Sequence, residues 1–109
     1  MSFRYMRVIV FFDLPNVTYE DRKNYNKFRK FLINDGFIMM QESVYCKLAM
    51  NSISANLIKE RVRKNKAPKG IIQMLSVTEK QFASIEYVIG SNQNNVLDST
   101  NRLVIFWLN

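Results

Sequence analysis

The chain has 109 residues, of which 48% are hydrophobic, and only 3 glycines and 2 prolines. This composition excludes a disordered chain and predicts one folded domain over residues 1–109. Sixteen Lys and Arg against nine Asp and Glu give a formal net charge of +7, which favours an anionic partner, nucleic acid before a membrane surface or an acidic protein.

The first predicted element is a strand over residues 5–12. It is nearly all apolar and rich in β-branched and aromatic side chains, which is typical of a central strand buried on both faces. Asp13, Leu14 and Pro15 end it. The carboxylate of Asp13 therefore stands at the end of the most hydrophobic segment of a chain that has few acids.

A helix is predicted over residues 18–34. Thr18 and Asp21 form a capping-box pattern at its start, and Gly36 can take the left-handed conformation that ends a helix. At ~100° per residue, one face carries the apolar residues and the rest carries positive charge. The apolar face comprises Tyr25, Phe28, Phe31 and Leu32, and the basic residues are Arg22, Lys23, Lys27, Arg29 and Lys30.

Residues 37–40 and 44–49 predict a hairpin or a bent strand pair, since residues 41–43 interrupt two apolar runs. A second helix is predicted over residues 52–64, with Ile53, Leu57, Ile58 and Val62 facing inward. Residues 59–69 carry six basic side chains and one acidic side chain. This segment is either a second nucleic-acid contact or a solvated helix end.

Strands are predicted over residues 71–77 and 82–89, and a last strand over 102–108. The order β-α-β-β-α-β, followed by two extra strands, predicts the α+β class and a ferredoxin-like sandwich with both helices on one face of an antiparallel sheet. The other face of the sheet is then open to a second copy of the chain.

Asp13 is the one acidic residue singled out for chemistry. Its place at a strand end is where sheet proteins often bind ligands, although an Asx-turn before Pro15 is the simpler explanation from the sequence alone. One carboxylate is too few for metal-dependent hydrolysis, but a two-fold homodimer would bring two copies of Asp13 together. The chain has no histidine and one cysteine, Cys46. The lone Cys46 fits a buried structural thiol in a reducing compartment.

No apolar run in the sequence is long enough for a membrane span, so a soluble, cytoplasmic protein is expected. The basic residues do not alternate with exposed aromatic residues, and no Gly-rich loop or RNA-recognition signature is present. These features favour contact with a phosphate backbone over base stacking.

Together, the strand ending in Asp13, the basic helix, Gly36 and the segment Gln41-x-Ser43-Val44-Tyr45 resemble the CRISPR-associated protein 2 family. The resemblance covers nearly the whole chain, and "GIIQMLSVTEKQF" is similar to the variant found in type II-A systems. It implies a ferredoxin-like homodimer that bridges dimers of the CRISPR-associated protein 1 integrase and holds double-stranded DNA during spacer insertion.

The resemblance also implies site residues. Several members are described as Mg²⁺-dependent endonucleases on single-stranded RNA or double-stranded DNA, with the metal between the strand-end aspartates, here Asp13. Helix-start basic residues touch DNA in some members; the matching positions are Arg22 and Lys23, and Lys27 follows on the same helix. The C-terminal end commonly meets the integrase, which gives the candidate docking residues Leu103, Val104, Ile105, Phe106, Trp107 and Leu108.

Three functional hypotheses follow. The first is a dimeric DNA-binding scaffold for spacer acquisition, which the lack of histidine and scarcity of carboxylates favour. The second is a Mg²⁺-dependent endonuclease that uses paired Asp13 residues. The third, unrelated to CRISPR, is a small RNA-binding or toxin-like ferredoxin domain. For residues 102–108, the alternative to integrase docking is a last strand that completes the core.

Overall fold

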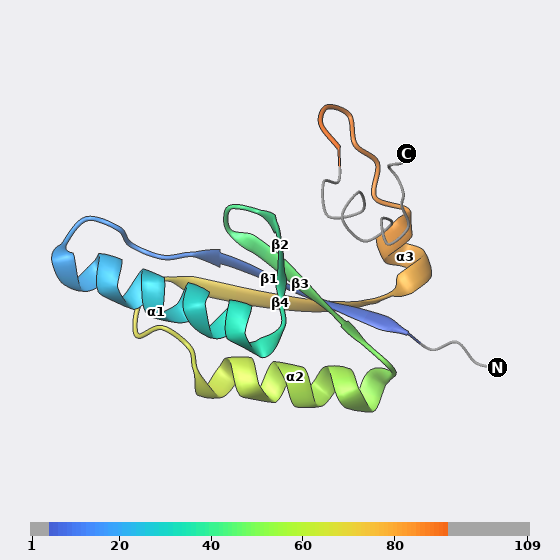
Figure 1. The fold of residues 1–109 in the computed structure, drawn as a ribbon, viewed down its shortest axis with the longest axis horizontal. Helices are drawn as coiled ribbons and strands as arrows, with labels where there is room; N and C mark the ends of the chain where they lie inside the picture. Colours follow the sequence, from blue (N-terminus) through green and yellow to red (C-terminus); the bar gives the residue numbers. More distant parts are fainter. Residues whose placement is uncertain (1–4, 92–109) are drawn as a thin grey trace.

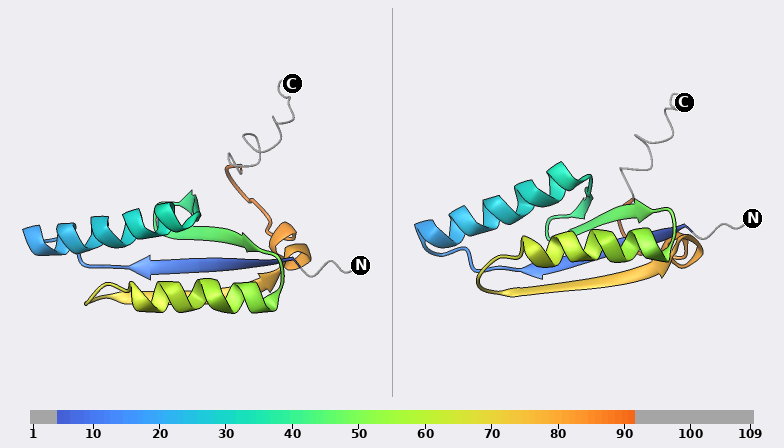
Figure 2. Two further views of the ribbon diagram at one scale, coloured as in Figure 1. Left: turned by 60° about the horizontal axis from the view of Figure 1, so that its bottom comes forward. Right: turned by 90° about the horizontal axis from the view of Figure 1, so that it is seen from below.

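In the computed structural model, which describes residues 5–91, two long helices cover one face of a four-stranded antiparallel sheet (Figures 1 and 2). The strand order is β2-β3-β1-β4, which confirms the predicted ferredoxin-like α+β fold. The elements are β1 (Met6–Asp13), α1 (Tyr19–Asp35), β2 (Ile38–Gln41), β3 (Val44–Ala49), α2 (Ser52–Lys64), β4 (Ile71–Thr78) and α3 (Glu79–Ala83).

The two faces of the sheet follow from the alternation of β1, which pairs with β3 on one side and with β4 on the other. Val8, Val10 and Phe12 are buried in the core against the helices. Because successive side chains of a strand point to opposite faces, Phe11 and Asp13 belong to the other face. We call this second face, which neither α1 nor α2 covers, the open face.

The core lies between the helices and the sheet, as the apolar pattern of α1 predicts. Phe28 and Leu32 of α1 are 2% and 0% exposed, and the Phe12 ring meets the Phe28 ring edge to face at 5.2 Å between centroids. Tyr25 and Phe31 pack partly buried against the same cluster. Cys46 is buried, as predicted.

Both ends of α1 are set by the predicted residues. The Asp21 backbone N–H donates to Thr18 Oγ1 at 3.0 Å, and the Asp21 carboxylate accepts from the Thr18 backbone N–H at 3.1 Å. This capping box holds the pKa of Asp21 below its ordinary value. Gly36 ends the helix at φ 104°, in the left-handed region.

Asp35, the last residue of α1, joins both helices and the sheet. Its carboxylate accepts hydrogen bonds from Arg61 Nε on α2 at 2.7 Å and from Lys47 Nζ on β3 at 3.3 Å. Burial acts to raise the pKa of Asp35, but the Arg61 hydrogen bond and the charge of Lys47 together hold it below its ordinary value of 3.8.

Asp35→Asn is expected to lower the free energy of unfolding at pH 7 by about 1–2 kcal/mol, because it weakens partly buried, charge-assisted hydrogen bonds. A depressed carboxylate pKa stabilises the fold above its unfolded value and loses that contribution as pH falls through the folded value. The gap between wild type and variant should therefore be constant from pH 7 to about 5 and shrink below about 4. Urea unfolding at pH 7, 5 and 3 measures this gap; a gap of unchanged size at pH 3 would contradict the ionic explanation.

The predicted strand over residues 82–89 is wrong. Thr78 and Gln81 form a second capping box that starts α3 directly after β4, and residues 84–91 contain no helix or strand. Ile85, Tyr87 and Ile89, whose alternation suggested the strand, are 41%, 45% and 90% exposed. Alternation alone predicts a strand only where a neighbour is available to pair with it.

The residues predicted to face inward on α2 are also partly wrong. Ile58 and Val62 are buried, but Ile53 and Leu57 are 71% and 59% exposed, and Ala55 is buried instead. At ~100° per residue, Ala55, Ile58 and Val62 share one side of the helix. Ile53 and Leu57 lie on the far side of α2. The prediction that they face inward followed their hydrophobicity rather than the helical period.

Among the described residues, no helix is long and apolar enough to cross a membrane. The predicted last strand, 102–108, lies outside the described residues.

Candidate nucleic-acid interface and metal site

Asp13 lies at the exit of β1, on the open face of the sheet. It pairs with Ile71 at the start of β4, and its side chain is exposed. Within residues 5–91, its carboxylate makes no hydrogen bond or ion pair, so the Asx-turn explanation finds no support there. The carboxylate is available to a partner outside the chain.

A close backbone approach fixes the segment that carries Asp13. Gly70, in the turn before β4, has φ 97°, and a Cβ atom on it would lie 2.7 Å from the Asp13 carbonyl oxygen and 2.8 Å from Leu14 Cδ2. Only glycine combines this left-handed conformation with such a contact. The sequence signal was present in the Pro68-x-Gly70 turn, but its packing against Asp13 is visible only in the fold.

The described residues of one chain do not form a group of three or more metal ligands around Asp13. Over the described part of the chain, no three His, Cys, Asp or Glu residues gather in a way that could hold a metal ion. Mg²⁺ is usually bound through one or two carboxylates together with water and substrate phosphates. Two copies of Asp13 related by a two-fold axis would supply two carboxylates for such a site, whereas Asp13 of one chain supplies one.

The open face is apolar for most of its width. Leu48 on β3 and Leu75 on β4 are 48% and 51% exposed, and both lie in register beside β1 on this face. Ile38 and Ile71 add exposed apolar side chains at the two outer strands. A sheet face of this kind is usually covered by another layer.

At the end of the open face away from Asp13, α3 is held by Arg7 of β1. Arg7 Nε and Nη2 donate to the two carboxylate oxygens of Glu79 at 2.8 and 3.0 Å, and the guanidinium lies 4.5 Å from the centroid of the Phe82 ring. The bidentate pair and the ring contact fix the start of α3 beside β1.

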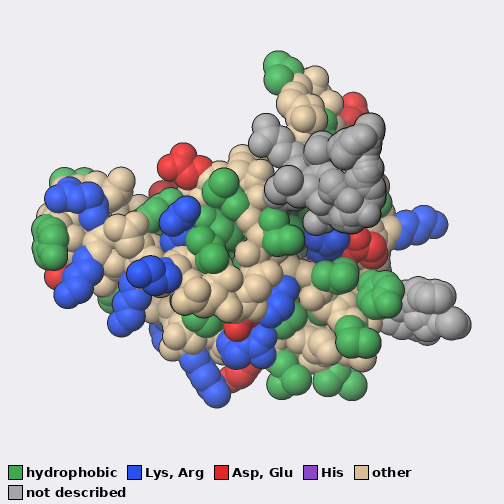
Figure 3. Space-filling model, viewed as in Figure 1, with side chains coloured by type: hydrophobic (Ala, Val, Ile, Leu, Met, Phe, Trp, Pro, Cys, Tyr) green, Lys and Arg blue, Asp and Glu red, His purple; other side chains and the backbone are tan. Residues whose placement is uncertain are grey.

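The predicted nucleic-acid residues Arg22, Lys23 and Lys27 are all exposed on α1. They line one open depression on that helix. Figure 3 shows Lys and Arg side chains gathered over the α1 end of the molecule. The structure thus brings these three residues together on one side of α1.

The basic segment 59–69 lies beside α1 rather than apart from it. Lys64 and Lys66 line a groove whose opposite wall is α1 with Lys27. We call it the α1–α2 groove; its lining is Asn24, Lys27, Phe28, Lys30, Phe31, Asn34, Lys64, Asn65, Lys66, Ala67 and Pro68. The sequence predicts Phe31 only as a core residue and gives Asn65 no function, because nothing in it places these two residues side by side. The candidate docking residues Leu103 to Leu108 lie outside the described residues.

Strand order and the placement of both long helices on one face assign the chain to the small ferredoxin-like α+β proteins. Comparison with known families is more specific. The model of the family described as "CRISPR associated protein Cas2" matches residues 6–85, and the chain belongs to this family.

Curated relatives agree with this assignment. The chain is 51% identical to a "CRISPR-associated endoribonuclease Cas2" of Treponema denticola over 92% of this chain and 99% of that protein. It is 48% identical to a protein of the same name from Streptococcus mutans, over 91% of each chain. A third, from Lacticaseibacillus rhamnosus, is 40% identical over 92% of this chain and 99% of that protein.

Proposed function

We propose that the chain is a homodimeric, DNA-binding scaffold of CRISPR adaptation, which bridges dimers of the CRISPR-associated protein 1 integrase while new spacers are inserted. The observations that carry this proposal are the exposed apolar side chains of the open face and the basic side chains on one side of α1. A scaffold needs an interface and phosphate contacts, for which the open face and α1 are suited.

The open face supports a homodimer. Its exposed leucines and isoleucines lie on the strands at both sides of β1, namely Ile38 on β2, Leu48 on β3, and Ile71 and Leu75 on β4. Burial of apolar area is the main driving force of such contacts. Because α1 and α2 lie on the other face, two chains can meet sheet to sheet and leave both pairs of helices accessible.

DNA contact through α1 yields a testable expectation. Arg22→Ala with Lys23→Ala should weaken duplex binding by a similar factor for every sequence and flatten its salt dependence, because contacts to phosphate carry no base information. Fluorescence anisotropy with two unrelated duplexes across a salt series measures both. The matched control is Lys59→Ala with Lys80→Ala, which removes two charges elsewhere. A changed sequence preference in the α1 variant would instead indicate base readout.

Integrase docking is proposed for residues 103–108. Deleting residues 101–109 should leave a soluble dimer that no longer co-elutes with the integrase on gel filtration. Normal co-elution of the truncated chain would contradict docking through this segment, and an insoluble product would assign the segment to the core.

The proposal as a whole is tested by co-purification with the integrase followed by an integration assay with and without this chain. Integration that depends on the chain is expected. Equal integration by the integrase alone would contradict the scaffold function.

A second candidate function is a Mg²⁺-dependent endonuclease acting on single-stranded RNA or double-stranded DNA. The exposed carboxylate of Asp13 on the open face favours it, as does the word endoribonuclease in the names of the relatives. Bound Mg²⁺ would supply charge neutralisation at the phosphate, and paired Asp13 residues would hold it. The family assignment argues against the third hypothesis, a domain unrelated to CRISPR.

A further inference from the structure

The α1–α2 groove has the size of a small-ligand site. Its volume is about 430 Å³, within the range of roughly 300–1,000 Å³ typical of ligand pockets. One wall is the middle of α1 and the other is the end of α2 with the turn that follows it. The DNA contacts proposed above rest on Arg22, Lys23 and Lys27. Lys27 also borders the groove, but neither Phe31 nor Asn65 is needed to explain those contacts.

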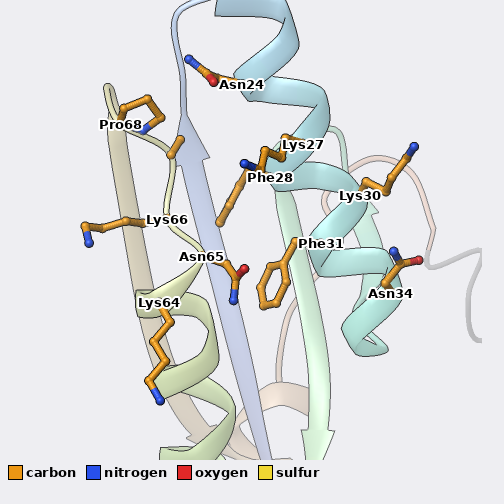
Figure 4. A pocket seen from close by; sticks show the side chains of 11 residues that line it. Asn24, Lys27, Phe28, Lys30, Phe31, Asn34, Lys64, Asn65, Lys66 and Pro68 are labelled. Atoms are coloured by element: carbon orange, nitrogen blue, oxygen red, sulfur yellow. The ribbon is translucent and has the colours of Figure 1, made fainter.

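The floor of the groove offers an aromatic ring and an amide. Phe31 is half-buried, packed on the core through one side. In Figure 4 its ring and the Asn65 side chain point toward each other across the groove. The accessible side of a partly buried aromatic ring can stack against a planar base, and an asparagine amide offers both a donor and an acceptor to a base edge.

The rim of the groove is positively charged. Lys27, Lys64 and Lys66 border it, and none of its described lining residues is acidic. The partial negative charge at the C-terminal end of α2 disfavours an anion here. The Asn65 backbone N–H and Nδ2 both donate to the Arg61 carbonyl oxygen, at 3.2 and 2.9 Å, and so partly satisfy that end. The positive charge of the three lysines therefore outweighs the partial negative charge of the helix end, and the rim favours binding of a phosphate.

We propose that the α1–α2 groove binds one unpaired nucleotide, with its base between Phe31 and Asn65 and its phosphate beside Lys27, Lys64 and Lys66. A base within a duplex is stacked on its neighbours and cannot reach Phe31 without leaving the stack. The nucleotide is either free or part of a single strand. This inference goes beyond the scaffold function, which needs only backbone contacts, and it applies equally to a nuclease.

The first test uses the full-length, unmodified chain. Its ¹⁵N-labelled amide spectrum is recorded with deoxythymidine monophosphate, with an eight-nucleotide oligothymidylate, and with an abasic phosphodiester of equal length. Shifts at Asn65 and Lys66 are expected with the oligothymidylate, and shifts with the mononucleotide as well would mean that a free nucleotide suffices. Shifts of equal size with the abasic chain, or no shift at these residues, would overturn the proposal.

The second test separates base from phosphate with variants. Phe31→Leu should weaken oligothymidylate binding about tenfold, the loss of one base–aromatic contact, and leave abasic binding unchanged. Lys66→Ala should weaken both, and Lys80→Ala on α3 is the matched charge control. Unfolding curves establish that each variant is folded; if Phe31→Leu is not, Asn65→Ala takes its place. If the Phe31 or Asn65 variant loses equal affinity for the oligothymidylate and for the abasic chain, base recognition is contradicted. The scaffold function is tested separately: it is unaffected by that result as long as duplex binding still requires Arg22 and Lys23.

Discussion

Asp13→Ala is expected to reduce any metal-dependent nuclease activity of the purified protein by about 100-fold or more and to leave spacer integration nearly unchanged. The reason is the position of Asp13: its carboxylate is exposed on the open face and bonds to nothing within the described residues, so its removal breaks no contact there. In a homodimer, two facing carboxylates repel each other and favour a cation or a shared proton.

Three measurements complete this test. Cleavage of labelled RNA and of duplex DNA is followed with and without Mg²⁺, and integration is followed with the integrase present. Glu42→Ala, which removes an exposed carboxylate from the β2–β3 turn, is the matched control and should affect neither activity. Loss of integration by a folded Asp13→Ala protein would contradict the scaffold function, whereas unchanged nuclease activity would exclude Asp13 as its metal ligand.

Leu75→Asp is expected to convert the proposed homodimer to a monomer of 12.9 kDa at micromolar concentration. Leu75 lies midway along β4, an outer strand of the open face, and is 51% exposed in the single chain. A carboxylate in an apolar interface costs several kcal/mol when it has no partner, which corresponds to a more than 100-fold loss of affinity between chains.

Leu57→Asp is the matched control for this dimer prediction. Leu57 is 59% exposed on the outer side of α2, and the same substitution there should leave the dimer intact. Sedimentation velocity of both variants measures whether each is a monomer or a dimer. A dimeric Leu75→Asp protein together with a monomeric Leu57→Asp protein would move the interface from the sheet to α2.

The sequence predicted the fold well where local chemistry and hydrophobic period agree. The helix from Thr18 to Gly36 is specified by a capping box, a glycine and an apolar stripe, and all three hold in the structure. At residues 82–89 the alternating side chains suggested a strand, but the capping box at Thr78 acts locally and starts a helix instead. A strand depends on a distant partner, so its pattern is the weaker signal.

Some features of the candidate site can likewise be predicted from the sequence, and others are visible only in the fold. Asp13 stands out in the sequence because it follows a buried strand, and the basic side of α1 follows from helical period. The α1–α2 groove could not be predicted, because Phe31 and Asn65 are 34 positions apart and meet only through the packing of both helices on the sheet. The contact of Gly70 with the Asp13 backbone was hidden for the same reason.

The bridging function is tested most directly by the mass of the complex that this chain forms with the integrase. Multi-angle light scattering of the co-purified complex should give two copies of this chain for four of the integrase, since one dimer is proposed to join two integrase dimers. A complex with a single integrase dimer, or no complex at all, would contradict the scaffold function.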